Sequence, residues 1–420
     1  MKYIDIFAGS GGLSEGFVRA GFDAIAHVEM NQDAIATIKT RLSYYYLKNN
    51  SKLSVYYQYL KGNITRTELY SMVPESILNT AIQYKMSEEN MSDLFLKIDK
   101  LKGDNSVDLV VGGPPCQAYS LAGRAKQRRL ALVQINGESE DDDRKYLYKL
   151  YCQFLKRFQP NLFVFENVLG LLTADGGKHW KDIKELFDLV GYNIDYKPLN
   201  SKDFGVAQER KRLIIIGWKK GTNFKYPDFP KVTPTWSIKD VLGDLPIINA
   251  GEVSNEYSSD NSHEYVSKNL RNKSDILTQH IARPVNNRDK AIYEIAIKEW
   301  NEDKRLKYGD LPSALKTHKN DKDFVDRFKV VPSGKSCCHT ILAHISKDGH
   351  YYIHYDLKQA RSITVREAAR IQSFPDNYFF EGSRTSAFIQ IGNAVPPMMA
   401  EGIAKALKLQ LINEGKDANV

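Results

Sequence analysis

Short apolar segments of strand length alternate with segments of helical spacing through the first two hundred residues of this 420-residue chain. No other feature constrains the fold as strongly, because such alternation is typical of a doubly wound, mostly parallel sheet with helices on its faces. The sequence therefore predicts an α/β fold. The expected strands are Tyr3–Phe7, Ala24–Val28, Val107–Val111, Leu162–Phe165 and Leu213–Ile216, and the expected helices include Leu13–Ala20, Asp33–Leu42 and Tyr146–Phe158.

The pattern changes after Trp218, where prolines interrupt the chain and polar, loop-like stretches follow. We expect a second, smaller and less regular domain here, since a single core rarely grows beyond roughly 250–300 residues. Helical spacing returns at Thr364, whose capping box with Glu367 predicts a helix that Pro375 limits. A final helix is predicted at Met398–Leu409.

Composition narrows the class of protein. The formal net charge of +8 is compatible with a polyanionic partner. The four cysteines are one adjacent pair and two distant single residues, which argues against a disulfide scaffold and favours a reduced, cytoplasmic setting. The first residues lack the apolar stretch of a signal peptide, and no run approaches ~18 apolar residues, so we expect no membrane span.

A glycine-rich turn, Asp-Ile-Phe-Ala-Gly-Ser-Gly-Gly at residues 5–12, follows the first predicted strand. Gly9 and Gly11 allow the backbone to approach a ligand closely, and a helix N-terminus offers free N–H groups. Ser14 stands where the dinucleotide fingerprint has its third glycine, so the match to a pyrophosphate ligand is imperfect. Glu29 ends the next strand and can accept both hydroxyls of a ribose. Either feature alone could be a packing turn or a surface carboxylate, but together they predict a nucleoside cofactor.

A rigid turn carries a cysteine directly after the strand Val107–Val111, in the sequence Gly-Gly-Pro-Pro-Cys-Gln. Ligands bind at the carboxyl ends of strands in open α/β sheets. Pro114 and Pro115 stiffen the backbone and remove two N–H donors. A single cysteine is usually a small buried hydrophobe, but this rigid presentation favours Cys116 as a nucleophile.

Two more polar groups are predicted at the same edge of the sheet. Glu166 follows the strand Leu162–Phe165, and a carboxylic acid beside a thiol suggests acid assistance to nucleophilic attack. Alone, it would be interpreted as a helix-start or surface residue. Arg210 and Arg212 share one face of an extended segment and can point into the same site, the alternative being a solvated basic edge.

These motifs, in this order, resemble those of the DNA (cytosine-5) methyltransferases over nearly the whole chain. Two later motifs complete the match, Arg-Glu-Ala-Ala-Arg-Ile-Gln-Ser-Phe-Pro-Asp at residues 366–376 and Gln-Ile-Gly-Asn-Ala-Val-Pro-Pro at residues 390–397. The resemblance implies a Rossmann-like catalytic domain over residues 1–218 that binds S-adenosylmethionine. It also implies a smaller, irregular target-recognition domain over residues 219–387 and a C-terminal segment, 388–420, that returns to the catalytic domain.

The resemblance also implies residue roles. Cys116 would add to carbon 6 of a flipped-out cytosine, while Glu166 holds and protonates ring nitrogen 3. Arg212, supported by Arg210, would contact the ring carbonyl. Asn63 is the nearest candidate for the adenine-contacting residue that follows the third strand in the family. The other implied cofactor contacts are Phe7, Gly9, Gly11, Glu29, Met30, Pro114, Asn393 and Val395.

The implied partner is double-stranded DNA, bound by a monomer of bacterial or phage origin, and the reaction requires no metal. A cognate restriction endonuclease that acts on the same site is a second candidate partner. Two alternatives stay open, a transfer-RNA cytosine-5 methyltransferase and a catalytically silent DNA-binding relative. The long stretch between Trp218 and Thr364 favours DNA, and the intact Cys116, Glu166 and Arg212 argue against a silent relative.

Three further segments carry expectations. The tyrosine-rich stretch Tyr44–Gln58 either covers the sheet edge or extends a helix. Arg124–Asp143 passes from a basic to an acidic cluster without apolar periodicity, which predicts a long loop. Histidines and cysteines gather between residues 337 and 354, but no Cys-x-x-Cys spacing is present, and a hairpin predicted at Lys347–Gly349 would scatter them over two faces. We therefore expect structural histidines there.

Overall fold

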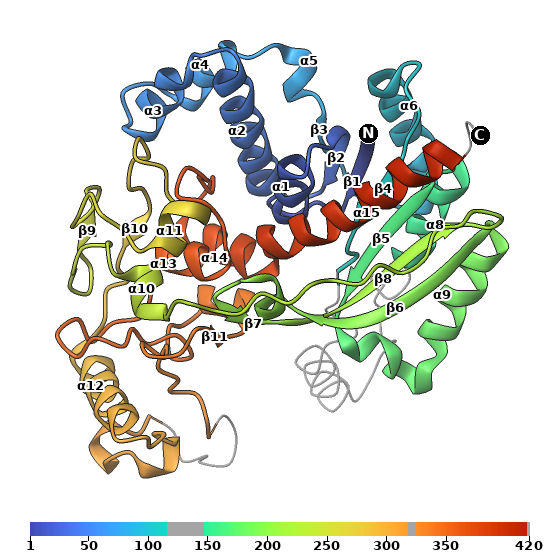
Figure 1. Ribbon diagram of the computed structural model, residues 1–420. Helices are drawn as coiled ribbons and strands as arrows, with labels where there is room; N and C mark the ends of the chain where they lie inside the picture. Colours follow the sequence, from blue (N-terminus) through green and yellow to red (C-terminus); the bar gives the residue numbers. More distant parts are fainter. Residues whose placement is uncertain (116–146, 318–324, 418–420) are drawn as a thin grey trace.

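Figure 1 shows the computed structural model of the chain, which describes residues 1–115, 147–317 and 325–417. A seven-stranded sheet consists of β1 (Lys2–Ile6), β2 (Asp23–Glu29), β3 (Ala81–Gln83), β4 (Leu109–Gly112), β5 (Leu162–Asn167), β6 (Tyr192–Asn200) and β8 (Lys211–Lys219). Their order is β3-β2-β1-β4-β5-β8-β6. The first five strands pair in parallel, whereas β8 is antiparallel to both β5 and β6. The prediction of a mostly parallel α/β sheet is confirmed.

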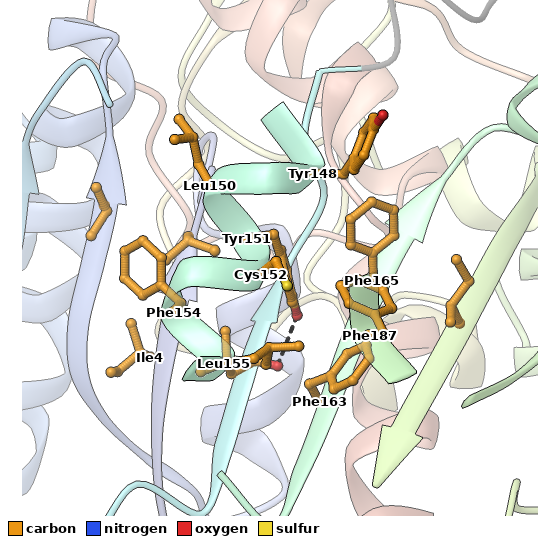
Figure 2. Close-up of a cluster of buried hydrophobic side chains, with 14 of the residues drawn as sticks. Ile4, Tyr148, Leu150, Tyr151, Cys152, Phe154, Leu155, Phe163, Phe165 and Phe187 are labelled. Carbon is orange, nitrogen blue, oxygen red and sulfur yellow. Dashed lines mark hydrogen bonds between the residues drawn. The ribbon is translucent and has the colours of Figure 1, made fainter. Parts of the chain in front are cut away.

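One face of the sheet is covered by α6 (Met91–Lys102), α8 (Leu147–Phe158) and α9 (Lys178–Leu189). Figure 2 shows Ile4, Phe163 and Phe165 of the sheet packed with side chains of α8 and α9. The hydroxyl of Tyr151 lies 3.0 Å from the carbonyl of Val110 and 2.9 Å from that of Val164. Tyr151 belongs to α8, so α8 contacts β4 and β5 through a polar group as well as through apolar packing. These two strands lead into two of the predicted catalytic motifs.

The other face of the sheet is covered by α1 (Gly12–Arg19) and the last helix, α15 (Pro397–Asp417). The two helices touch backbone to backbone at Gly16, where an added Cβ would lie 2.4 Å from the Cβ of Ala400. The predicted final helix is therefore present, and it packs on the first helix of the sheet domain. The helix before it, α14 (Arg384–Asn393), crosses residue 387, so the domain boundary predicted there falls inside a helix.

The region after β8 has shorter elements. One apolar cluster surrounds α10 (Ile238–Leu242), α11 (Glu264–Asn269), α13 (Val365–Ile371) and α14, and a separate one surrounds α12 (Asn287–Asn301). The strand pairs are β9 (Val253–Ser254) with β10 (His280–Ile281), and β7 (Gln208–Glu209) with β11 (Cys338–His339). The capping box predicted at Thr364 and Glu367 is present at the start of α13.

Two local expectations can be compared with the structure. The tyrosine-rich stretch extends a helix, because α2 (Gln32–Asn49) runs through its first half and α3 (Leu53–Leu60) follows. The hairpin predicted at Lys347–Gly349 is wrong: η8 (Ala343–Ser346), a short 3-10 helix, precedes it, and Gly349 packs against Ser362 instead. The long loop predicted at Arg124–Asp143 lies outside the described residues.

None of the helices within the described ranges is both long and apolar enough to cross a membrane.

Candidate active site

Several of the predicted site residues lie at one edge of the sheet. The carboxyl ends of parallel strands share an edge, so Phe7 after β1, Glu29 at the end of β2, Pro114 after β4 and Glu166 in β5 all lie there. Arg212 joins them because β8 is antiparallel and therefore begins at that edge. The structure describes the cysteine turn as far as Pro115, and Cys116 itself lies outside the described residues.

Glu166 and Arg212 form an ion pair beside the cysteine turn. The Nε of Arg212 lies 2.9 Å from Oε1 of Glu166, and the two side chains are 12% and 13% exposed. The second carboxylate oxygen, Oε2, faces Gly113, where an added Cβ would lie 2.5 Å away. The carboxylate therefore rests against the turn that leads into Cys116, and only glycine leaves room for it.

Two buried contacts hold that turn in place. An added Cβ at Gly112 would lie 2.0 Å from the carbonyl oxygen of Ile6, so β4 and β1 approach too closely for a side chain. The side-chain amide of Asn167, which is buried, donates to the carbonyl of Pro114 at 3.3 Å. Sequence reasoning gave Asn167 no role, although its position directly after Glu166 at a strand end was an available signal.

Glu29 is hydrogen-bonded to the glycine turn. The carboxylate of Glu29 accepts from the backbone N–H of Gly9 at 2.9 Å and from that of Asn31 at 2.8 Å. Gly9 has a positive φ of 55°, and the space where its side chain would be is open. A carboxylate next to open space on a glycine turn fits the ribose of a nucleoside ligand. Met30 is exposed beside it.

The chain after α14 also reaches the glycine turn. An added Cβ at Gly12 would lie 2.4 Å from the carbonyl oxygen of Val395 and 3.1 Å from the Cβ of Ala394. Asn393 is exposed and Val395 is buried. The structure thus brings residues from the two ends of the chain to one place, as the resemblance implies for a cofactor site.

Asp5 is a buried acid beneath this turn that sequence reasoning missed. Its Oδ2 accepts from the hydroxyl of Ser14 at 2.8 Å. Burial raises the pKa of Asp5 to about 7, an effect that the hydrogen bond from Ser14 partly offsets. The available signal was an acidic residue inside an otherwise apolar strand.

Asn63 is not where the sequence interpretation placed it. The third strand is β3, which begins only at Ala81, whereas Asn63 lies between α3 and α4 (Arg66–Ser71). Its side chain is exposed and donates to Oε1 of Gln58 at 2.5 Å. The assignment of Asn63 to a position after the third strand is therefore wrong, because additional helices separate β2 from β3.

Arg210 differs from Arg212 in its partners. Its buried guanidinium donates to the carbonyl of Ile341 at 2.9 Å and to that of Gly392 at 3.0 Å. Both arginines were expected to point into the same site from one face of an extended segment, but the partners of Arg210 lie in other parts of the chain than Glu166, the partner of Arg212. Arg210 holds two backbone segments together, while Arg212 binds Glu166.

Three of the four histidines of residues 337–354 have different hydrogen-bond or ion-pair partners. His339 hydrogen-bonds the carbonyl of Tyr351, His350 lies 3.0 Å from the Tyr293 hydroxyl, and His354 lies 3.6 Å from Glu367. Burial lowers the pKa of His339 and that of His354 to about 4. Within residues 1–115, 147–317 and 325–417, no group of three or more His, Cys, Asp or Glu side chains is arranged to hold a metal ion.

Comparisons with known proteins give matches over nearly the whole chain. A model of the family described as C-5 cytosine-specific DNA methylase matches residues 1–54 and 77–409, and thus omits the segment that contains Asn63. The Type II methyltransferase M.Bpa9945I of Bacillus paralicheniformis is 41% identical over 452 residues, which cover 97% of this chain and 98% of that protein. The Type II methyltransferase M1.HphI of Haemophilus parahaemolyticus is 31% identical and covers 99% and 88%, respectively.

Among solved structures, the chain is similar to a putative DNA modification methyltransferase encoded within a prophage of E. coli. The TM-score is 0.63, and the alignment covers 98% of this chain and 99% of that one. At 24% sequence identity, this likeness shows the fold.

Proposed function

The chain belongs to the C-5 cytosine-specific DNA methylase family, and from this premise we propose how its residues methylate carbon 5 of a cytosine in duplex DNA. One observation carries the proposal. Arg212 holds the Glu166 carboxylate at 2.9 Å, and the other oxygen of that carboxylate faces Gly113, in the turn that leads into Cys116. An acid and a thiol are the two groups that activation of a cytosine ring requires.

The proposed methyl donor is S-adenosylmethionine, which supplies an electrophilic methyl group. Glu29 accepts hydrogen bonds from the ribose hydroxyls, and the support for this is its carboxylate next to the open space at Gly9. The remaining contacts come from Phe7, Gly11, Met30 and Pro114 on one side and from Asn393 and Val395 on the other.

The proposed chemistry uses the thiolate of Cys116 and the carboxyl group of Glu166. The sulfur forms a bond to carbon 6 of the cytosine while Glu166 gives a proton to nitrogen 3, which makes carbon 5 nucleophilic. Carbon 5 would then bond to the methyl group of the donor, and S-adenosylhomocysteine would leave. A base then removes the proton of carbon 5, the bond between sulfur and carbon 6 breaks, and nitrogen 3 returns its proton. Arg212 binds one oxygen of Glu166 through Nε and the carbonyl of Lys211 through Nη1, and its Nη2 is the proposed donor to the ring carbonyl. Arg210 supports it by fixing the preceding backbone.

DNA that carries 5-fluorocytosine at the target tests this chemistry. The wild-type protein should form a covalent adduct, because fluorine cannot leave carbon 5 as a proton does. Cys116→Ala should form none, whereas the control Cys337→Ala should still form it. An adduct with Cys116→Ala would refute the nucleophile. Glu166→Gln should slow methyl transfer by ~100–10,000-fold, the usual contribution of general acid catalysis, and wild-type turnover would refute the acid.

Recognition of the target sequence is proposed to lie in residues 219–387, outside the catalytic domain of residues 1–218. The separate apolar cluster around α12 supports a unit that can vary independently of the sheet. The target cytosine must leave the base stack, which costs a few kcal/mol and is offset by pocket contacts. Exchange of residues 219–363 with those of a relative should change the methylated sequence. A chimera that is active at the original site would move recognition elsewhere.

The proposed partners follow from the same family. Type II relatives support a cognate restriction endonuclease that acts on the same sequence. Duplex DNA is favoured over transfer RNA, and incorporation of labelled methyl groups into each substrate separates the two. Incorporation into either one excludes a catalytically silent protein. We propose that the protein acts as a monomer, which sedimentation of the protein with and without DNA tests.

A further inference from the structure

The C-terminal end of α14 is held by side chains from two distant segments. The last carbonyl groups of a helix lack partners inside the helix. Here the side-chain amide of Gln372 donates to the carbonyls of Ile391 at 3.2 Å and Ala394 at 2.7 Å. The guanidinium of Arg210 donates to the carbonyl between them, that of Gly392. Three carbonyls within four residues are therefore fixed by buried groups rather than by solvent.

Gln372 belongs to a relay of two buried amides. The backbone N–H of Ile341 donates to Oε1 of Gln208 at 2.8 Å, and Nε2 of Gln208 donates to Oε1 of Gln372. The relay begins at a donor and ends at two carbonyl acceptors. Neither amide can flip without placing like groups together, so the direction of the whole relay is fixed. Both glutamines are fully buried.

The relay sets the position of one wall of the proposed cofactor site. Residues 393–395 leave the end of α14 and lie on the glycine turn, where the carbonyl of Val395 is 2.4 Å from the place of a Cβ on Gly12. Behind them, Gly392 is pressed against the segment that contains Ile341, since an added Cβ would lie 2.2 Å from the backbone nitrogen of Ala343.

We propose that Gln372 and Gln208, together with Arg210, are positioning residues that set the affinity of the protein for its nucleoside cofactor. This inference rests on the proposed function in assigning residues 393–395 to the cofactor site and Arg212 to the target base. The three side chains fix that turn against the glycine turn, and Arg210 lies two residues before the base-contacting Arg212. The cofactor wall and the edge that binds the base are thus fastened to each other by one set of buried hydrogen bonds.

The test uses Gln372→Glu, which keeps the shape of the side chain but places a carboxylate oxygen against two carbonyl oxygens. Calorimetry with S-adenosylhomocysteine on the folded protein should show affinity weaker by about tenfold or more, the effect of losing buried hydrogen bonds. Gln359→Glu is the matched control. Gln359 is a buried glutamine that hydrogen-bonds Asp356, Arg361 and Ile248, all in the region after β8, which is called the second region below. Its variant should keep wild-type affinity.

A double-mutant cycle tests whether the relay acts as a unit. Gln208→Leu and Gln372→Leu should each weaken binding, and the double variant should bind no more weakly than the worse single one. Gln208→Leu also carries the test if Gln372→Glu fails to fold. Wild-type affinity in a folded relay variant, or an equal loss in Gln359→Glu, would overturn the positioning role. A wild-type protein that does not bind S-adenosylhomocysteine would instead refute the proposed cofactor.

Discussion

Asp5 in the sheet and Glu367 in the second region are both fully buried carboxyl groups, yet their surroundings shift their pKa values in opposite directions. Burial raises the pKa of Asp5 to about 7, and its hydrogen-bond donor is the neutral hydroxyl of Ser14. Burial opposes ionisation of Glu367 as well, but the attraction and hydrogen bonds of Arg361, with smaller contributions from His354 and His280, together outweigh it, so the pKa of Glu367 falls well below its usual value. The guanidinium of Arg361 donates two hydrogen bonds of 2.8 Å to the carboxylate of Glu367.

The contrast extends to how each region keeps its shape. In the sheet, parallel ladders and the apolar packing of Figure 2 place the proposed catalytic edge. The second region has short strands, and its core includes the fully buried Arg370, which binds Asp244 and Asp376. Directional, charge-assisted hydrogen bonds define geometry where no regular ladder is available. The two regions should therefore respond differently when a single contact is removed.

The largest effect is expected at the sheet edge, where one methyl group should disable catalysis. Gly113→Ala would place a Cβ 2.5 Å from Oε2 of Glu166 and so displace the proposed acid. Turnover should fall by ~100-fold or more, within the range of general acid catalysis, while the protein stays folded. Gly309→Ala is the control, because its Cβ would enter open space and turnover should be unchanged. Full activity of Gly113→Ala would mean that the carboxylate tolerates displacement.

The next effect is expected on stability, in the second region. Arg370→Met leaves Asp244 and Asp376 without their shared cation. Breaking a buried ion pair by removing one partner costs about 3–5 kcal/mol, which chemical denaturation can measure. Arg288→Met removes the partly exposed pair with Asp289 and should cost under about 1 kcal/mol. Similar losses for both variants would show that the buried network contributes no more than a surface pair.

A pH series should separate the two buried acids by the sign of their effect. Asp5 has a folded pKa of about 7 against a usual 3.8, so its contribution to stability is fully present below 3.8 and is lost as pH rises through 7. Asp5→Asn should therefore raise the melting temperature relative to wild type at pH 8 and not at pH 4.

Glu367 should show the reverse. Its pKa is depressed from 4.5, so its contribution is fully present above pH 4.5 and is lost as pH falls through the folded value. Glu367→Gln should lower the melting temperature at pH 8, and the difference from wild type should shrink in acid. The same pH trend in both variants would contradict the comparison.

The smallest effect is expected where the two regions meet. In the segment 55–76, the hydroxyl of Tyr59 donates to Glu381 at 2.6 Å and that of Tyr56 to the carbonyl of Asn377 at 2.8 Å. Tyr59→Phe should cost about 1–2 kcal/mol, the range for a hydrogen bond to a charged group at a half-buried site. The hydroxyl of Tyr84 bonds Asn90 and Asp93 in the sheet region, so the control Tyr84→Phe should not change how the two regions unfold together. Calorimetry measures this. Two separate unfolding transitions in Tyr84→Phe but not in Tyr59→Phe would contradict the expectation.

Local patterns in the sequence determined the sheet and most of the edge that carries the proposed site residues. Apolar alternation predicted β1, β2, β4, β5 and β8, because each of these strands is short, apolar and bounded by glycine, proline or polar residues. The carboxyl ends of parallel strands meet at one edge. Glu29, Glu166 and Arg212 could therefore be brought together from the sequence alone, before any distance was known.

Tertiary structure alone decided the partners of groups whose contacts lie far along the chain. Arg210 binds the carbonyl of Gly392, and the side chain of Gln372 fixes the same helix end, so neither role is visible in nearby residues. Asn63 was misplaced because inserted helices delay the third strand to Ala81. Local propensity reports the conformation of a segment, whereas the partner of a buried polar group depends on which segments pack beside it. That packing is settled only when the whole chain has folded.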